Sequence, residues 1–291
     1  MDIVIITDSC SDLPLSYIKE HNLPIINYTY NNQGTEFIDD LGQTISHKEF
    51  YDLIREGAMP TTSQINSQIF YDGFESYIKE GKAVIFISFS SALTGSVNNA
   101  IMARHMILEN YPDADLTIVD TRAASLGQGL LVHYALEMLE GGSSKEEIVT
   151  WLEENKLRLN HWFTVSDINH LRRGGRISGA AAFVANIVDI KPVLGIDDSG
   201  SLIPIHKTKG RKRAIRMLID KFEEYAINPQ EQVVAISHAD SPEDANLLAD
   251  RIKRKFNVKD IIIGNIGPTI GSHAGPDTLA LFFLAERRFL D

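Results

Sequence analysis

Short apolar runs alternate with helical patterns through the first half of the 291-residue chain, and this alternation limits the folds open to it. Strand-like runs occur at 3–7, 23–30, 83–88 and 116–121. Patterns typical of helices occur at 15–21, 48–57, 67–81, 96–109, 129–140 and 145–156. Because strands that are apolar throughout are buried on both faces, this order predicts a parallel sheet covered by helices on both sides.

The second half predicts another α/β unit. Strand-like runs occur at 191–196, 201–207, 233–238 and 260–265, and helical patterns occur near 211–226 and 242–256. The turn sequence DDSG between the first two strands predicts a hairpin, so the pairing should be partly antiparallel. We place the boundary near residue 158, which gives domains 1–158 and 159–291. We also expect a C-terminal helix that can pack back on the first domain.

Charge and cysteine content narrow the class of protein. The net charge of −11 gives no reason to expect general nucleic-acid binding. A single cysteine, Cys10, allows no intramolecular disulfide and fits a reducing cytosol. The first ten residues lack a basic segment, and no apolar run approaches the length of a membrane span. We therefore expect no signal peptide, no membrane segment and a cytoplasmic location.

Four hydroxyl side chains crowd the loop SFSSALTG at 88–95, where a predicted strand passes into a predicted helix. Ligands of α/β sheets bind outside the carboxyl ends of the strands, and the unpaired N–H groups of a helix N-terminus favour an anion. Gly95 permits close approach of the backbone. Thr94 either caps the helix or donates its hydroxyl to a bound anion, and the residues alone leave both interpretations open.

Two further polar stretches stand next to predicted elements. TDSCSD at 7–12 follows the first strand, and capping or turn formation explains its polar side chains about as well as a ligand does. PTTSQIN at 60–66 supplies Thr61 and Thr62 just before a predicted helix, for which Asn66 is a suitable N-cap. These hydroxyls are candidates for the same anion.

Basic residues gather at 171–184 and 206–216 of this acidic chain. The ordinary explanation of the second group is a helix face in contact with solvent. The more specific hypothesis is that it binds an anion or an acidic partner protein. The small apolar run GAAAFVANIV at 179–188 fits tight helix packing or an acyl chain that passes close to the backbone. The sequence IGPTIGSHAGPD at 266–277 predicts a loop whose glycines expose His273.

Several chemical signatures are missing from the sequence. The nine histidines show no metal-ligand spacing, so no metal is expected. GQG at 127–129 lacks the third glycine of a dinucleotide fingerprint, and no GxSxG, Walker or HExxH motif occurs. The residues indicate a two-domain protein with a hydroxyl-lined anion pocket and an apolar extension, without naming its ligand.

The segments TDSCSDLP, PTTSQ, SSALTG, LRRGGRIS, KPVL and IGPTIGSHAGP follow one another over nearly the whole chain. This ordered set resembles the DegV family of bacterial fatty-acid-binding proteins. The resemblance implies an N-terminal Rossmann-like domain with a parallel sheet and a second α/β domain with a mixed or antiparallel sheet. It also implies a long-chain fatty acid bound between the two domains.

The resemblance carries specific positions onto this chain. The positions that match the family's ligand-binding loops are Thr61, Thr62, Ser91, Thr94, Gly95 and His273. The family's basic residue after the KPxL hairpin matches Lys209 or Arg211, because KTKGRKR departs from the usual arginine-then-threonine pattern. Ile65 replaces a common proline and Asp277 a common glycine, and neither change removes a polar group.

The resemblance also implies a role. Better-understood members are binding subunits of fatty acid kinase. They present the carboxylate to a separate ATP-dependent kinase subunit, and the acyl phosphate then passes to an acyltransferase of phospholipid synthesis. A non-catalytic carrier without a cofactor is therefore expected. The alternative, from another class, is a stand-alone lipid hydrolase or acyltransferase that uses a loop serine and His273.

Overall fold

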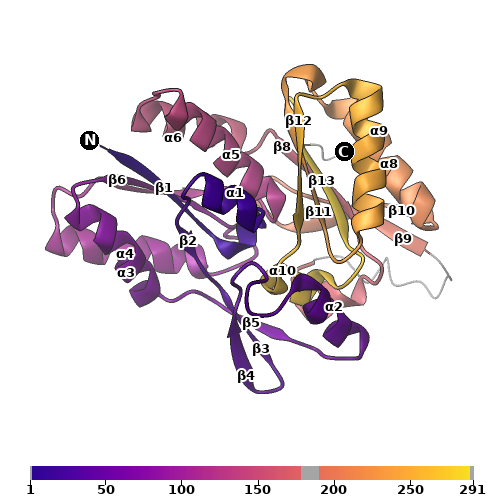
Figure 1. Ribbon diagram of the computed structural model, residues 1–291, viewed down its shortest axis with the longest axis horizontal. Coiled ribbons are helices and arrows are strands. Elements are labelled where there is room, and N and C mark those ends of the chain that lie inside the picture. Colours follow the sequence, from indigo (N-terminus) through magenta and orange to yellow (C-terminus); the bar gives the residue numbers. More distant parts are fainter. Residues whose placement is uncertain (1, 178–189, 289–291) are drawn as a thin grey trace.

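The apolar strands of the first half form one parallel sheet in the order β2-β1-β6-β7 (Figure 1). Their bounds are β1 Ile3–Asp8, β2 Ile25–Ile26, β6 Ala83–Ser88 and β7 Leu116–Asp120. Every residue of β6 is buried, as its continuous apolar run predicts. The structure is a computed structural model, and it describes residues 2–177 and 190–288.

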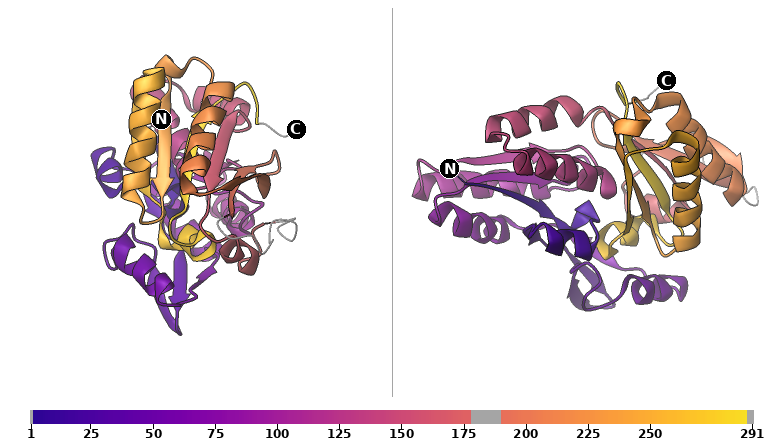
Figure 2. Two further views of the ribbon diagram at one scale, coloured as in Figure 1. Left: turned by 90° about the vertical axis from the view of Figure 1, so that its right-hand side faces the viewer. Right: turned by 45° about the horizontal axis from the view of Figure 1, so that its top comes forward.

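Helices cover both faces of this sheet, with α3 and α4 on one side and α5 and α6 on the other (Figure 2). The bounds of the N-terminal helices are η1 Ser9–Ser11, α1 Leu15–Glu20, α2 His47–Arg55, α3 Ser67–Lys79, α4 Ser96–Asn110, α5 Leu126–Glu140 and α6 Lys145–Asn155. All six predicted α-helices of this half are confirmed, and Asn66 caps α3 by accepting from the Ile69 amide at 2.9 Å.

The prediction of a single strand at 23–30 is wrong, because the chain leaves the parallel sheet in the middle of that run. The amide of Tyr28 donates to Ser9 Oγ at 3.0 Å instead of continuing the ladder. The chain then enters a small antiparallel sheet of order β4-β3-β5. Its strands are β3 Thr29–Asn32, β4 Thr35–Ile38 and β5 Thr61–Ser63. Thr61 and Thr62 therefore lie on a strand, where the sequence had predicted a loop.

The second half forms a mixed sheet of order β10-β9-β8-β13-β11-β12. Its strands are β8 Leu159–Thr164, β9 Ile190–Ile196, β10 Leu202–Lys209, β11 Val233–His238, β12 Asp260–Asn265 and β13 Leu279–Leu284. The predicted hairpin is confirmed by the antiparallel β9–β10 pair. The expected C-terminal helix is wrong, because 279–284 is a central strand that pairs with both β8 and β11.

Helix α5 packs against both sheets, whereas α8 (Arg211–Tyr225) and α9 (Pro242–Phe256) pack against the second sheet (Figure 1). The remaining helical segments are α7 Asn169–Arg173, η3 Pro229–Glu231 and α10 Pro268–Ala274. The GQG segment lies at the start of α5 and serves packing. A Cβ at Gly129 would lie 2.6 Å from the Ser11 carbonyl oxygen, and one at Gly127 would lie 2.2 Å from His161 Nε2.

The chain is a two-domain α/β protein, but the exact boundary after residue 158 stays a prediction. β8 begins at Leu159, directly after that point. One buried cluster nevertheless contains Ile85 of the first sheet, Leu131 of α5 and Phe282 of the second sheet. Across the described ranges, none of the helices has the length and apolar character that crossing a lipid bilayer requires.

We predict that Gly129→Ala lowers the free energy of unfolding by about 1–3 kcal/mol, because the added methyl group would overlap the Ser11 carbonyl oxygen. Gly73→Ala in α3 is the matched control, since its Cβ would meet only the end of the Ile26 side chain at 3.0 Å. The control should stay within about 1 kcal/mol of the parent. Urea denaturation measures both, and an unchanged Gly129→Ala protein would contradict this packing.

Candidate ligand-binding site

A cavity lies where the carboxyl ends of β6 and β7 face the second sheet. Phe89 follows β6, whereas Phe163, Ile196 and Phe282 come from strands of the second sheet. The apolar part of its wall consists of Phe89, Leu93, Phe163, Leu171, Ile196, Leu202, Ile266, Ile270 and Phe282. The empty space inside the lining is about 830 Å³, its opening to solvent included. An apolar wall that carries a few polar groups is typical of small-molecule sites.

A group of polar side chains lines the same cavity and joins the two domains. Thr62 on β5 and His273 on α10 meet at 2.8 Å between Oγ1 and Nε2. Thr94 lies at 3.5 Å from the Tyr28 hydroxyl, which donates to it. Gln64 connects the two loops, because a Cβ on Gly95 would lie 2.6 Å from Gln64 Oε1. An apolar cavity with a hydroxyl and imidazole group can hold an amphipathic anion.

His273 is partly buried and lies on helix α10, so the prediction of an exposed loop histidine is wrong. Pro268 opens α10 at its first turn, and Gly275, with a φ of +76°, ends it. The helix turns the ring toward Gly174, where a Cβ would lie 2.2 Å from His273 Nδ1. Burial, and then the positive charge of Arg176, lower the pKa of His273 to about 4. The ring is therefore neutral at pH 7 and carries one N–H.

The N-terminus of α4 differs in detail from the expectation. Gly95 is the N-cap residue, so the prediction that Thr94 occupies the N-cap position is wrong by one residue. The Thr94 hydroxyl still accepts from the Ser96 amide at 3.2 Å and lies 3.0 Å from Ser96 Oγ. Thr94 therefore supports the first turn of the helix while it also lines the cavity.

Two of the predicted hydroxyls do not line the cavity. The Ser91 hydroxyl donates to Asp120 at 2.5 Å and lies on the exposed side of its loop. Thr61 lines a neighbouring surface cleft. Successive residues of a strand point to opposite sides, so of the two threonines on β5 it is Thr62 that reaches His273.

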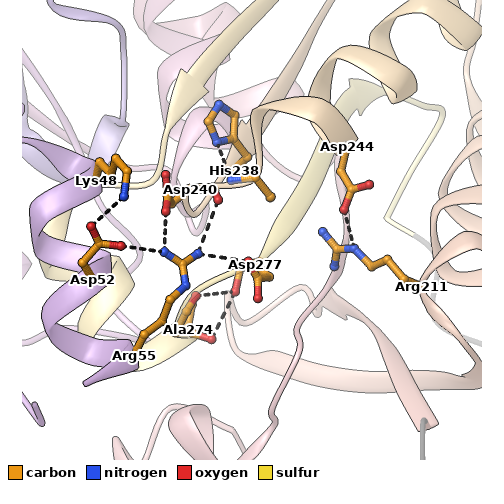
Figure 3. Close-up of polar contacts among 12 residues, drawn as sticks. Lys48, Asp52, Arg55, Arg211, His238, Asp240, Asp244, Ala274 and Asp277 are labelled. Atoms are coloured by element: carbon orange, nitrogen blue, oxygen red, sulfur yellow. Dashed lines mark hydrogen bonds and ion pairs between the residues drawn. The ribbon is translucent and has the colours of Figure 1, made fainter. Parts of the chain in front are cut away.

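The arginines near the cavity come from the basic segment 171–184 and not from the segment that holds Lys209 and Arg211. Arg211 forms an ion pair with Asp244 at 2.7 Å (Figure 3), and neither residue lines the cavity. Lys209 is exposed at the end of β10. Arg176 lines both the cavity and the cleft, and Arg173 lines the cleft. The sequence had marked 171–184 as basic without assigning these two arginines, and this basic run was the signal that could have identified them.

The TDSCSD segment has a structural explanation. Asp8 caps η1 by accepting from the Cys10 amide at 3.0 Å and also accepts from the Phe89 amide at 3.0 Å. Burial raises the pKa of Asp8 to about 7. Asp12 accepts from the Gly267 amide at 2.9 Å, and burial raises the pKa of its carboxyl group as well. Capping, one of the two open interpretations, accounts for these residues.

Within residues 2–177 and 190–288, no three His, Cys, Asp or Glu side chains form a group that could hold a metal ion. The apolar run GAAAFVANIV lies outside the described residues.

We predict that His273 of the ligand-free protein titrates near pH 4, well below the ordinary imidazole value of 6.5. The unfolded chain then binds this proton at a higher pH than the folded chain. The contribution of His273 to stability is present above pH 6.5 and is lost as the pH falls toward 4. NMR titration of the ring measures the pKa directly, and an apparent pKa near 6.5 would show that the ring is solvated.

The comparisons with known proteins agree with this architecture. The family model described as "Uncharacterised protein, DegV family" matches residues 2–286. A DegV domain-containing protein of Clostridium perfringens is 48% identical over 285 residues, which cover 98% of each chain. A DegV lipid-binding protein of Thermotoga maritima superposes with a TM-score of 0.87 at 30% identity over 99% of this chain and 100% of that one. A fatty-acid-binding DegV family protein of Thermus thermophilus gives a TM-score of 0.89 at 29% identity over 98% and 100%. The chain therefore belongs to the DegV family.

Proposed function

We propose that this protein binds one long-chain fatty acid, with the acyl chain in the apolar cavity and the carboxylate at Thr62, Thr94 and His273. The observation that carries the proposal is the meeting of an apolar cavity with the Thr62–His273 contact. Each methylene group that leaves water contributes about 0.8 kcal/mol, so a long chain gains much from this wall. The fatty acids bound by the solved relatives support the same ligand class.

The polar group suits a carboxylate because each member can donate a hydrogen bond. If the neutral His273 ring donates from Nε2 to Thr62 Oγ1, the Thr62 hydroxyl is free to donate to the ligand. The Thr94 hydroxyl supplies a second donor from the other side of Gln64. A carboxylate buried without donors is very unfavourable, and Arg176 adds positive charge in the lining. These residues replace the water that the headgroup loses.

We further propose that the protein is a cytoplasmic carrier that presents the fatty acid to a separate kinase subunit. The cleft beside the cavity shares Thr62, Arg176 and His273 with it, so a phosphoryl donor that enters the cleft reaches the headgroup. A carboxylate oxygen would attack the γ-phosphorus of ATP, the bond to the β–γ bridging oxygen would break, and ADP would leave. The acyl phosphate would then pass to an acyltransferase of phospholipid synthesis.

The alternative of a stand-alone hydrolase or acyltransferase receives less support. A hydrolase of this kind requires a nucleophilic serine whose hydroxyl is hydrogen-bonded to the His273 ring. The hydroxyl in contact with the ring belongs to Thr62, and Ser91 donates to Asp120 instead. A carrier needs only donors around the carboxylate, which is what the lining supplies.

We predict that Thr62→Val and Thr94→Val each weaken fatty-acid binding by about 1.5–3 kcal/mol, since each removes a hydrogen bond to a charged group. Ser91→Ala is the matched control, because its hydroxyl lies outside the cavity lining and it should bind like the parent. Displacement of a fluorescent fatty acid gives the three dissociation constants, and ligand-free thermal unfolding checks the fold. If all three variants bind the fatty acid as tightly as the parent protein does, the carboxylate must lie elsewhere.

The carrier role makes a separate prediction. With a cognate kinase subunit and Mg-ATP the bound fatty acid should become an acyl phosphate, and the protein alone should not consume ATP. Arg211→Ala should retain lipid binding and lose most of the transfer, because we assign Arg211 or Lys209 to partner contact. Arg254→Ala, an exposed cation near the end of α9, is the control. If Arg211→Ala supports phosphoryl transfer at the parental rate, Arg211 does not make the partner contact. If the protein turns over ATP without the kinase subunit, the carrier role is excluded.

A further inference from the structure

Helix α10 belongs to the second domain, but residues of the first domain hold the start of its segment. The amide of Gly267 donates to Asp12 Oδ1 at 2.9 Å, and the amide of Thr269 donates to Asp39 Oδ2 at 3.0 Å. The Tyr51 hydroxyl donates to the Ile266 carbonyl oxygen at 2.8 Å. Both carboxylates are buried, and an amide left without its acceptor in this interior would be unfavourable.

The chain beyond the other end of α10 is held by an arginine of the first domain (Figure 3). Arg55, the last residue of α2, donates from Nη2 to Asp277 Oδ1 at 3.2 Å and pairs through Nη1 with Asp240. Asp277 and Asp240 both have positive φ angles, of 60° and 53°. Their loops are joined by the Asp277 amide, which donates to the Ala239 carbonyl oxygen at 2.7 Å. Arg55 therefore connects the loop that follows β11 with the loop that precedes β13.

A helix as short as α10 does not hold its own position. It has seven residues, and helices of fewer than about 12 residues are marginal in isolation. Contacts at its two ends must therefore fix where His273 lies. The two domains meet again at that residue, where Nε2 lies 2.8 Å from Thr62 Oγ1.

We propose that Asp12, Asp39 and Arg55 are positioning residues for the carboxylate site, which act by holding α10 so that His273 stays against Thr62. None of the three lines the cavity, and in this proposal their effect on a ligand passes through the position of His273. The proposal rests on the proposed function, because it treats His273 as part of the fatty-acid site. Two independent readouts, the state of the His273 ring and the affinity for the lipid, keep the two claims separable.

The test uses Arg55→Gln, with Arg55→Lys as the milder variant and Arg254→Gln as the matched control. Lys48 is unsuitable as a control, because its partner Asp52 also pairs with Arg55. Arg254 lies in the last turn of α9 and makes an exposed ion pair with Asp250. In ligand-free protein, Arg55→Gln should shift the His273 ring resonances and move its pKa from about 4 toward 6.5. Arg254→Gln should leave both unchanged. Unaltered His273 resonances in a folded Arg55→Gln or Arg55→Lys protein would overturn the inference, whether or not the protein binds lipid.

A double-mutant cycle tests the route of the effect. Arg55→Gln and Asp39→Asn should each weaken oleate binding by about 3- to 30-fold in the parent protein. In a His273→Ala background they should weaken it no further, because their effect passes through that ring. Additive losses would show that they act on the site in another way and would contradict the proposal. If the parent protein fails to bind oleate, the proposed function fails, and the ring titration still decides the positioning claim.

Discussion

One hydrogen bond, between Thr62 Oγ1 and His273 Nε2, is the contact on which the geometry of the candidate site depends. Its partners are 211 residues apart in the sequence and belong to different domains. β5 is held by its pairing with β3, and residues of the first domain hold the chain at both ends of α10. The contact supplies the polar group of a cavity that is otherwise walled by aromatic and aliphatic side chains. A carboxylate can enter such a cavity only where donors replace its water.

The sequence predicted the elements whose pattern is local. β6, with its unbroken apolar run, and α9, with its helical spacing and terminal charges, are confirmed with the predicted bounds. β13 was expected as a helix, because the leucines and alanine of LALFFL also favour helices and only its pairing with β8 and β11 makes it a strand. The departure of the chain at Tyr28 depends on Ser9, which no local pattern reveals.

The candidate site shows the same division between local and tertiary information. Hydroxyl-rich loops and a histidine marked Thr62, Thr94 and His273, and the structure brings all three to one cavity. Which hydroxyl of a loop turns inward is a tertiary property, so Ser91 looked equivalent to Thr94 although it pairs with Asp120. The basic residue of the lining, Arg176, was visible only as part of a charged run. The turn after α7 is what brings the Arg176 side chain to the cavity.

Lipid extraction and native mass spectrometry of the purified protein test the central claim most directly. The account predicts one long-chain fatty acid per chain, or stoichiometric uptake of oleate or palmitate by protein from which lipid has been removed. A protein that is isolated without lipid, and that also fails to take up either fatty acid, would contradict the account.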